Sequence, residues 1–244
     1  MKSQPKVIAL KTAFQLSDMP GQDAAHLDRS NNLHDAAYEQ MRQALINGRF
    51  KPGQTFTIRT LAAVFGTSPM PVRDALKRLV AERVLELRPN RSVAVPFMSR
   101  SRFQEILQIR LALEPMLVAR AVPCLSAEQI GVMAHQHEQM CEAEKRQDPA
   151  AYLAANRRFH FQIYEAARTV VMMPIVEALW MQIGPYLREV FGAQKAATRT
   201  AEHHHIGILR ALRRYDPEAA ARGVWSDISD AADEILAGNL FSDR

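Results

Sequence analysis

From Phe103 onward the apolar residues recur at intervals of three and four, and no strand pattern interrupts them. This spacing predicts amphipathic helices, because 3.6 residues per turn place such residues on one face. Pro123, Asp148-Pro149, Pro174 and Asp216-Pro217 punctuate the pattern, as residues at helix ends do. We therefore predict an all-helical bundle. Its helices are expected at 103–121, 127–146, 149–167, 174–194, 201–214 and 217–237.

The segment before this bundle has a different pattern. Three short helices are predicted to start at Asn32, Thr57 and Ser68, which are typical N-cap residues. Gly48 and Gly66 are predicted to end the first two helices. Two β-favouring runs follow and predict a hairpin, so the segment reads as a winged helix-turn-helix. The hairpin strands are expected at 84–87 and 92–95.

The composition excludes several classes of protein. A chain of 244 residues can bury two ordinary cores, and its two cysteines do not make a disulfide framework. There is no apolar run of membrane-spanning length and no secretory signal at the N-terminus, so we expect a cytoplasmic protein without a membrane partner. We predict a mostly α fold with a winged helix-turn-helix and an all-helical bundle. The expected units are an arm at 1–32, the winged domain at 33–97, a linker at 98–102 and the helical domain at 103–240.

The charge is concentrated in the predicted winged domain. From Gln40 to Val95 there are ten Lys or Arg and three acids, a net charge of +7, whereas Met98 to Arg244 has a net charge of −1. A basic module joined to a nearly neutral remainder predicts binding to a polyanion, with double-stranded DNA as the expected partner. The alternative is a generally basic protein without a specialised region.

Five residues of the winged domain are candidates for DNA contact. Arg73 lies opposite the apolar stripe of the third helix, where it can reach a guanine edge with two donors. Arg59 opens the second helix, Ser68 can donate to a phosphate, and Asn90 and Arg91 form the wing tip. For each residue alone the alternative is a solvated surface position, but their joint placement favours DNA binding.

Four polar residues of the helical domain predict a second site. Asn156 and His160 are four residues apart and therefore share one helix face. His205 and Asp227 lie 11 residues before and after the turn at Asp216, so they reach the same height on antiparallel helices. Their convergence in the bundle core predicts a metal site. A metal-free, hydrogen-bonded cluster is the alternative.

The other histidines of this domain are expected outside the metal site, and one arginine has two possible roles. Of His203-His204-His205 only one can face the core, since helical neighbours point about 100° apart, and we favour His205. His135 and His137 are expected at the surface. Arg110 interrupts an apolar stripe, and it either pairs with Glu114 or faces a pocket and holds a ligand carboxylate.

The basic segment contains Lys51-Pro52-Gly53, Leu61-Ala62, Gly66-Thr67-Ser68-Pro69-Met70-Pro71-Val72-Arg73-Asp74-Ala75-Leu76 and the following Leu79. With these motifs it resembles the winged-helix domain of the GntR family of bacterial transcription regulators. It departs from the family pattern at Ile58, Met70 and Ser92, where Glu, Thr and Gly are usual.

The helical remainder contains Arg110-Leu111-Ala112-Leu113-Glu114, Asn156-Arg157-Arg158-Phe159-His160, and His205 with Ile208-Leu209, Ala211-Leu212 and Asp216. With these motifs it resembles the FCD effector domain. Together the two resemblances cover about residues 34–240.

These resemblances imply a homodimeric regulator, most often a repressor, that binds a DNA operator and senses a small carboxylate or sugar acid. Many FCD domains hold a divalent metal, and Asn156, His160 and His205 match three of the ligand positions. Asp227 stands where the last histidine is usual, and this ligand set suits Zn, Ni, Mn or Fe. The resemblance also implies that Arg110 lines the effector cavity.

Two other functions remain open at this point. A helical metalloenzyme with a DNA-binding arm is permitted by the ligand set, although no catalytic motif accompanies it, and we expect no enzyme activity. A DNA binder that responds to no ligand is the other alternative.

Overall fold

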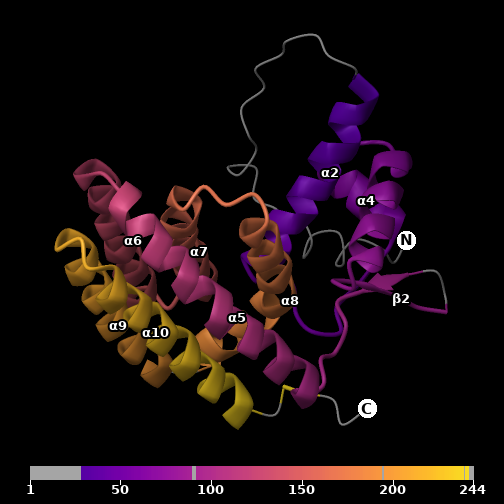
Figure 1. Ribbon diagram of the computed structural model, residues 1–244. Coiled ribbons are helices and arrows are strands. Elements are labelled where there is room, and N and C mark those ends of the chain that lie inside the picture. The colour runs from indigo at the N-terminus through magenta and orange to yellow at the C-terminus, as the bar shows by residue number, and fades with distance from the viewer. Residues whose placement is uncertain (1–28, 90–91, 194, 239, 242–244) are drawn as a thin grey trace.

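The computed structural model describes residues 29–89, 92–193, 195–238 and 240–241, which form two domains packed side by side (Figure 1). The first domain contains α2 (Arg29–Ile46), β1 (Thr55–Phe56), α3 (Ile58–Phe65), α4 (Pro69–Ala81), β2 (Glu86–Leu87) and β3 (Val93–Ala94). The second contains α5 (Arg100–Ala121), η2 (Val122–Cys124), α6 (Ala127–Lys145), α7 (Pro149–Ala166), α8 (Met172–Ala193), α9 (Lys195–Arg213) and α10 (Pro217–Ala237). The mostly α architecture is confirmed.

Local sequence explains how the first domain forms a winged helix-turn-helix. The Thr57 side chain caps α3 by accepting from the Thr60 N–H, and Gly66 ends α3 in the left-handed conformation, with φ of +63°. The corner that follows leads into α4, whose first residue is Pro69. The predicted hairpin forms from β2 and β3, although each strand is shorter than expected.

The sequence pattern missed one strand and misplaced one helix start. β1 pairs antiparallel with β3, which gives a three-stranded sheet in the order β1-β3-β2. Two residues are too few to show strand alternation, so only the pairing with β3 reveals β1. α2 begins at Arg29 rather than after Asn32, so the end of the predicted arm is helical. The rest of that predicted arm lies outside the described residues.

The six long helices expected in the second domain are all present, with earlier starts in three of them. α5 begins at Arg100, within the predicted linker, and α9 begins at Lys195 instead of residue 201. α8 begins at Met172, so Pro174 lies in its first turn, where a missing N–H removes no helical hydrogen bond. Within the part of the chain that the structure describes, no helix is long and apolar enough to cross a membrane.

Helix α8 packs against α2 and so contributes much of the contact between the two domains. Figure 1 shows it beside α2 of the first domain, with α7 of the second domain on its other side. At Gly184 the two backbones meet, because a Cβ atom there would lie 2.2 Å from the Leu45 carbonyl oxygen and 2.9 Å from that of Ile46. A side chain at this position would therefore force the domains apart.

Polar contacts also fasten α8 to the first domain, among them the bond from Arg188 Nη1 to the Gly48 carbonyl oxygen over 3.2 Å. Arg42 of α2 forms an ion pair with Glu177, with Nη1 and Oε2 2.8 Å apart. The Tyr186 hydroxyl accepts a hydrogen bond from the Met98 N–H in the segment that joins the domains. α8 thus joins the winged domain to the helical domain through both backbone and side-chain contacts.

Candidate functional site

Three of the four predicted metal ligands meet in the core of the helical domain. His160 on α7, His205 on α9 and Asp227 on α10 each place one possible ligand atom within 4.8 Å of the others. Both histidines are 1% exposed and Asp227 is 9% exposed. The equal height of His205 and Asp227 on antiparallel helices, inferred from their distances to the turn, is confirmed by this contact.

The spacing of these atoms fits a bound divalent ion. His160 Nε2 is 3.2 Å from Asp227 Oδ2 and 3.3 Å from His205 Nε2, and His205 Nε2 is 3.8 Å from Asp227 Oδ1. Ligand atoms at about 2.0–2.2 Å from one metal lie roughly 3.0–3.5 Å from each other. Two imidazoles and a carboxylate therefore surround a point at which such an ion would sit.

A buried hydrogen-bond network extends from this cluster and was missed in the sequence. Glu114 of α5 is fully buried and pairs with Arg110, whose Nε lies 2.5 Å from Oε1. Tyr164 and Trp180 donate to the other carboxylate oxygen over 2.7 and 3.1 Å. The Tyr164 hydroxyl is in turn 3.2 Å from Nδ1 of His160. The i, i+4 spacing of Arg110 and Glu114 is visible in the sequence, but the partners of Glu114 on α7 and α8 are not.

This network fixes the tautomer of His160. Burial and the neighbouring Glu114 carboxylate raise the pKa of Tyr164 well above its ordinary value, so its one proton stays on the hydroxyl and is donated to Glu114. The hydroxyl can then only accept from His160, which places the imidazole N–H at Nδ1. An imidazole that carries one N–H, at Nδ1, has its lone pair on Nε2, the atom that lies 3.2 Å from Asp227 Oδ2.

Two facing acceptors need a positive charge between them, supplied by a proton or a metal cation. Burial lowers the pKa of His205 to about 3, so this imidazole is neutral and able to ligate. Burial alone would raise the pKa of Asp227, but the adjacent His205 and His160 lower it to about 2, so the carboxylate is ionised. A neutral His205 and an ionised Asp227 are the forms in which these side chains coordinate a metal.

The remaining candidates near the cluster have mixed outcomes. Asn156 is buried one turn before His160 on α7, so its role as a fourth ligand stays a prediction. His205 is the buried member of its triplet, as expected, while His204 bonds Asp230 over 2.7 Å. His135 is exposed, as expected, whereas His137 is half-buried rather than at the surface. The ring centroid of His137 lies 5.9 Å from that of His205.

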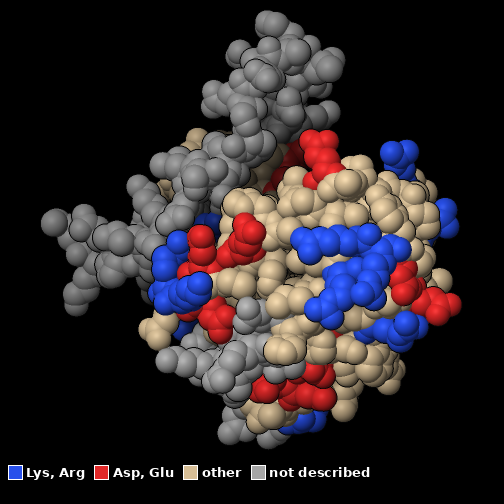
Figure 2. Space-filling view, turned by 90° about the vertical axis from the view of Figure 1, so that its left-hand side faces the viewer, with Lys and Arg blue, Asp and Glu red and all other residues tan. Residues whose placement is uncertain are grey.

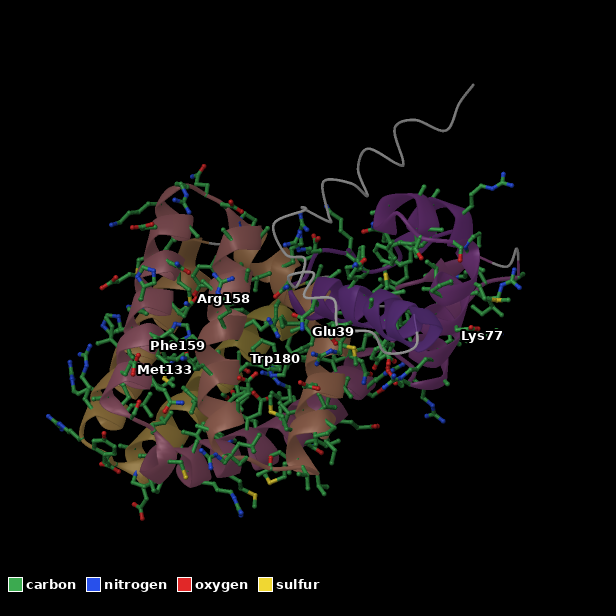
Figure 3. The ribbon with its side chains drawn as sticks, turned by 90° about the horizontal axis from the view of Figure 1, so that it is seen from above. Glu39, Lys77, Met133, Arg158, Phe159 and Trp180 are labelled. Carbon is green, nitrogen blue, oxygen red and sulfur yellow. The ribbon has the colours of Figure 1, made fainter. Side chains whose placement is uncertain are left out.

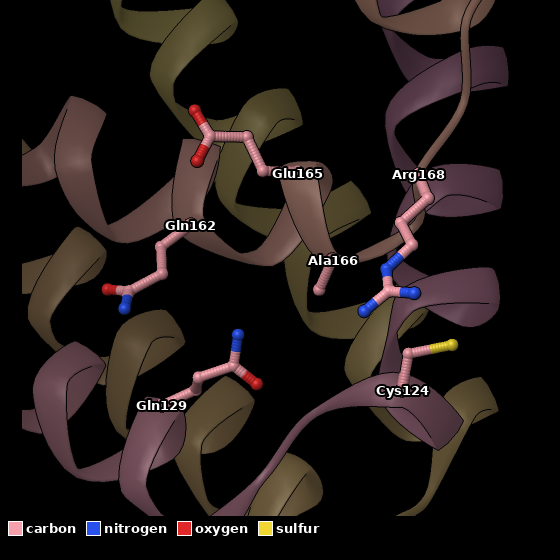
Figure 4. A pocket seen from close by; sticks show the side chains of 6 residues that line it. All are labelled: Cys124, Gln129, Gln162, Glu165, Ala166 and Arg168. Atoms are coloured by element: carbon pink, nitrogen blue, oxygen red, sulfur yellow. The ribbon is translucent and has the colours of Figure 1, made fainter.

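A separate cavity of about 270 Å³ lies at the end of α7 and contains none of the predicted site residues. Figure 4 shows Gln129 and Gln162 facing each other on one side and Arg168 above Cys124 on the other, while Glu165 points away. Its lining residues are Cys124, Gln129, Gln162, Glu165, Ala166 and Arg168. The cavity is therefore distinct from the histidine cluster.

The predicted DNA-contacting residues that the structure describes are all exposed. Arg59 is the second residue of α3, and Arg73 lies on α4. Ser68 directly precedes α4, and its side chain makes no capping hydrogen bond. Figure 3 labels Lys77 on the outer side of this domain, away from Trp180 and Phe159 of the helical domain. The other two predicted contacts, Asn90 and Arg91, lie outside the described residues.

The helical domain also carries basic side chains, although its net charge is near zero. Figure 2 views the molecule from the side of this domain and shows Lys and Arg gathered in one area with acids at its borders. Arg210 and Arg213 in the last turn of α9 are exposed cations of this domain, placed where the helix dipole favours positive charge. Their favourable interaction with the C-terminal end of α9 accounts for these two arginines without binding of a polyanion.

Comparison with known proteins supports the division into two domains. Residues 33–95 match "Bacterial regulatory proteins, gntR family", and residues 105–230 match the FCD domain. The regulator McbR of Escherichia coli is 31% identical over 180 residues, covering 73% of this chain and 81% of that protein. The gluconate operon transcriptional repressor of Bacillus subtilis is 23% identical over 221 residues, covering 87% and 88%.

A solved structure agrees with these matches. The structure of E. coli McbR/YncC superposes with a TM-score of 0.79 at 27% identity and covers 84% of this chain and 97% of that one. The family matches and relatives are transcription regulators rather than enzymes, which confirms the expectation of no enzyme activity. The chain therefore belongs to the GntR family of bacterial regulatory proteins and is a transcription regulator with an FCD domain.

Proposed function

We propose that this regulator binds an operator as a homodimer and is controlled by a small organic acid bound at a divalent metal in the helical domain. The observation that carries the proposal is the convergence of His160 Nε2, His205 Nε2 and the Asp227 carboxylate within 4.8 Å of one another in the core of the helical domain. His160, His205 and Asp227 would hold the ion, with Asn156 as a fourth ligand. Zn, Ni, Mn and Fe all accept these ligands.

The effector proposal rests on open coordination positions and on one relative. Four protein ligands leave room for a carboxylate on an ion of higher coordination number, and the relative named for a gluconate operon supports a sugar acid. Arg110 lies in the same network, 8% exposed, and its pairing with Glu114 is shown. We retain its contact with the effector as part of the proposal.

The first test is metal content followed by a ligand screen. Purified protein is analysed for bound metals, and thermal shifts are recorded with gluconate and other sugar acids, before and after treatment with a chelator. The proposal expects a metal that copurifies and an acid that stabilises only the metal-loaded protein and releases it from DNA. An acid that stabilises the stripped protein equally would contradict the role of the metal.

For DNA binding, we expect Arg73→Ala to weaken specific binding by about 1–3 kcal/mol and to relax preference at one base position. The reason is the loss of a bidentate contact from an exposed arginine on α4. Fluorescence anisotropy on duplexes selected from a random pool measures this. Arg213→Ala, which removes an exposed arginine of the helical domain, serves as the matched control and should bind as the parent does.

For assembly, we expect the full chain to sediment as a dimer of about 55 kDa, twice its 27.5 kDa, at micromolar concentration. One winged helix covers one half-site, so specific control of an operator favours two-fold symmetry. The helical domain has more exposed large apolar residues than the winged domain and should carry the interface. Those residues include Ile109, Met116, Val132, Ile175, Ile206 and Trp225. A monomer in sedimentation equilibrium would contradict this part of the proposal.

A further inference from the structure

Met70 is an exposed apolar side chain in the first turn of α4. It is 57% exposed, although the same helix buries Val72, Leu76 and Leu79 in the domain core. Covering an exposed apolar side chain with an apolar partner is favourable, because it removes apolar surface from water. The fold of this domain does not use Met70, so its side chain is free for a partner.

The residues around Met70 make this end of α4 poor in hydrogen-bond donors. Pro69 and Pro71 flank it and carry no N–H, so among the first three helical residues only Met70 has a backbone donor. The first turn also contains no acid. A surface with few donors and no negative charge is suited to an apolar contact rather than to a network of phosphate hydrogen bonds.

The charges next to Met70 identify the kind of partner. Arg73 follows it by three residues and therefore lies on the same face of α4, and Arg59 of α3 is also exposed. Asp74, four residues after Met70, is paired with Lys77 at 3.5 Å, which leaves Arg73 as the exposed charge beside Met70. An apolar group beside an arginine fits DNA, which offers one strongly apolar group in the major groove, the C5-methyl of thymine. A protein partner would be expected to cover a larger apolar area than one side chain.

We infer that Met70 is a specificity-determining residue that contacts a thymine methyl group in the operator. The inference rests on the proposed DNA binding and specifies one operator base that the protein recognises. Met70 and Arg73 are about 4.5 Å apart along the helix axis, at 1.5 Å per residue. Because base pairs rise about 3.4 Å, the thymine lies one or two base pairs from the guanine that Arg73 reads.

The test removes the methyl group alone. A duplex selected from a random pool by the full chain is synthesised again with deoxyuridine in place of each thymidine in turn, and Kd is measured for each duplex. At one thymine per half-site the parent should bind about fourfold more weakly, the factor that corresponds to about 0.8 kcal/mol for one buried methyl-sized group. In Met70→Ala the ratio of Kd for the deoxyuridine duplex to Kd for the thymidine duplex should fall to about one, because the side chain that contacts the methyl group is gone.

Two control variants distinguish a failure of this inference from a failure of the proposed DNA binding. Met116→Ala removes a methionine of similar exposure, 59%, from the helical domain and should keep the fourfold ratio even if overall affinity changes. Arg73→Ala should bind more weakly to both duplexes and also keep the ratio. A selection that enriches no duplex contradicts the proposed DNA binding and this inference together. Enrichment with a ratio unchanged in Met70→Ala, or with no thymine sensitive to methyl removal, contradicts the inference alone.

Discussion

The double substitution His160→Ala/His205→Ala is expected to abolish tight binding of divalent metal to the helical domain. Both imidazoles are buried and their Nε2 atoms lie 3.3 Å apart, so the variant loses two of the ligand atoms that surround the proposed ion. We expect metal affinity to fall by more than about 100-fold, because losing only an outer hydrogen-bond partner costs about 10- to 100-fold. Isothermal titration of chelator-treated protein measures the affinity directly.

His204→Ala is the matched control for this substitution. It removes the neighbouring imidazole, which bonds Asp230 rather than the cluster, and should leave metal affinity unchanged. Basal binding to the selected duplex should survive in the double variant, since the substituted residues lie in the other domain, while release by the effector should be lost. A double variant that binds metal as the parent does, or that still responds to the acid, contradicts the proposed sensor.

Glu114→Ala is expected to lower the free energy of unfolding by about 3–5 kcal/mol, because it leaves the buried Arg110 guanidinium without its counter-charge. It also removes the acceptor shared by Tyr164 and Trp180, so two further buried donors lose their partner. Chemical denaturation of the metal-free protein measures this change without a contribution from ligand binding.

Two comparisons test the stated cause of that loss. Glu165→Ala removes an exposed carboxylate of α7 and should change the free energy of unfolding by no more than about 0.5 kcal/mol. The pair Arg110→Met/Glu114→Leu removes both charges and should recover part of the loss, since a buried ion pair can be replaced by apolar groups. A Glu114→Ala variant within about 1 kcal/mol of the parent would show that Arg110 finds another partner or water.

The helical domain was predictable because its signals are local and repeated. Periodicity and the Asp-Pro and Pro breaks located its helices, and counting from Asp216 was enough to bring His205 level with Asp227. Helix starts were less accurate, since Pro174 marks a first turn as readily as it marks a break. The approach of His137 to His205 depends on how α6 packs on α9, which no spacing within one helix reveals.

Long-range partnerships were the part that the sequence did not reveal. Glu114 was visible as a possible partner of Arg110, but its bonds from Tyr164 and Trp180 join residues 50 and 66 positions away. β1 was missed for the same reason, because its only evidence is pairing with β3. These contacts decide the tautomer of His160, so the strongest argument for a cation depended on the three-dimensional structure.

The mechanical stiffness of α8 is not uniform along its 22 residues. Its first half carries Trp180, which bonds the network behind the histidine cluster, and its second half carries Tyr186, which bonds the segment leading to the winged domain. Between them lie Gly184 and Pro185, two residue types at which helices bend most easily, and Pro185 gives no N–H to the turn before it. A displacement of Trp180 would therefore bend α8 at this pair, where α8 packs against α2, and would change the angle between the two domains.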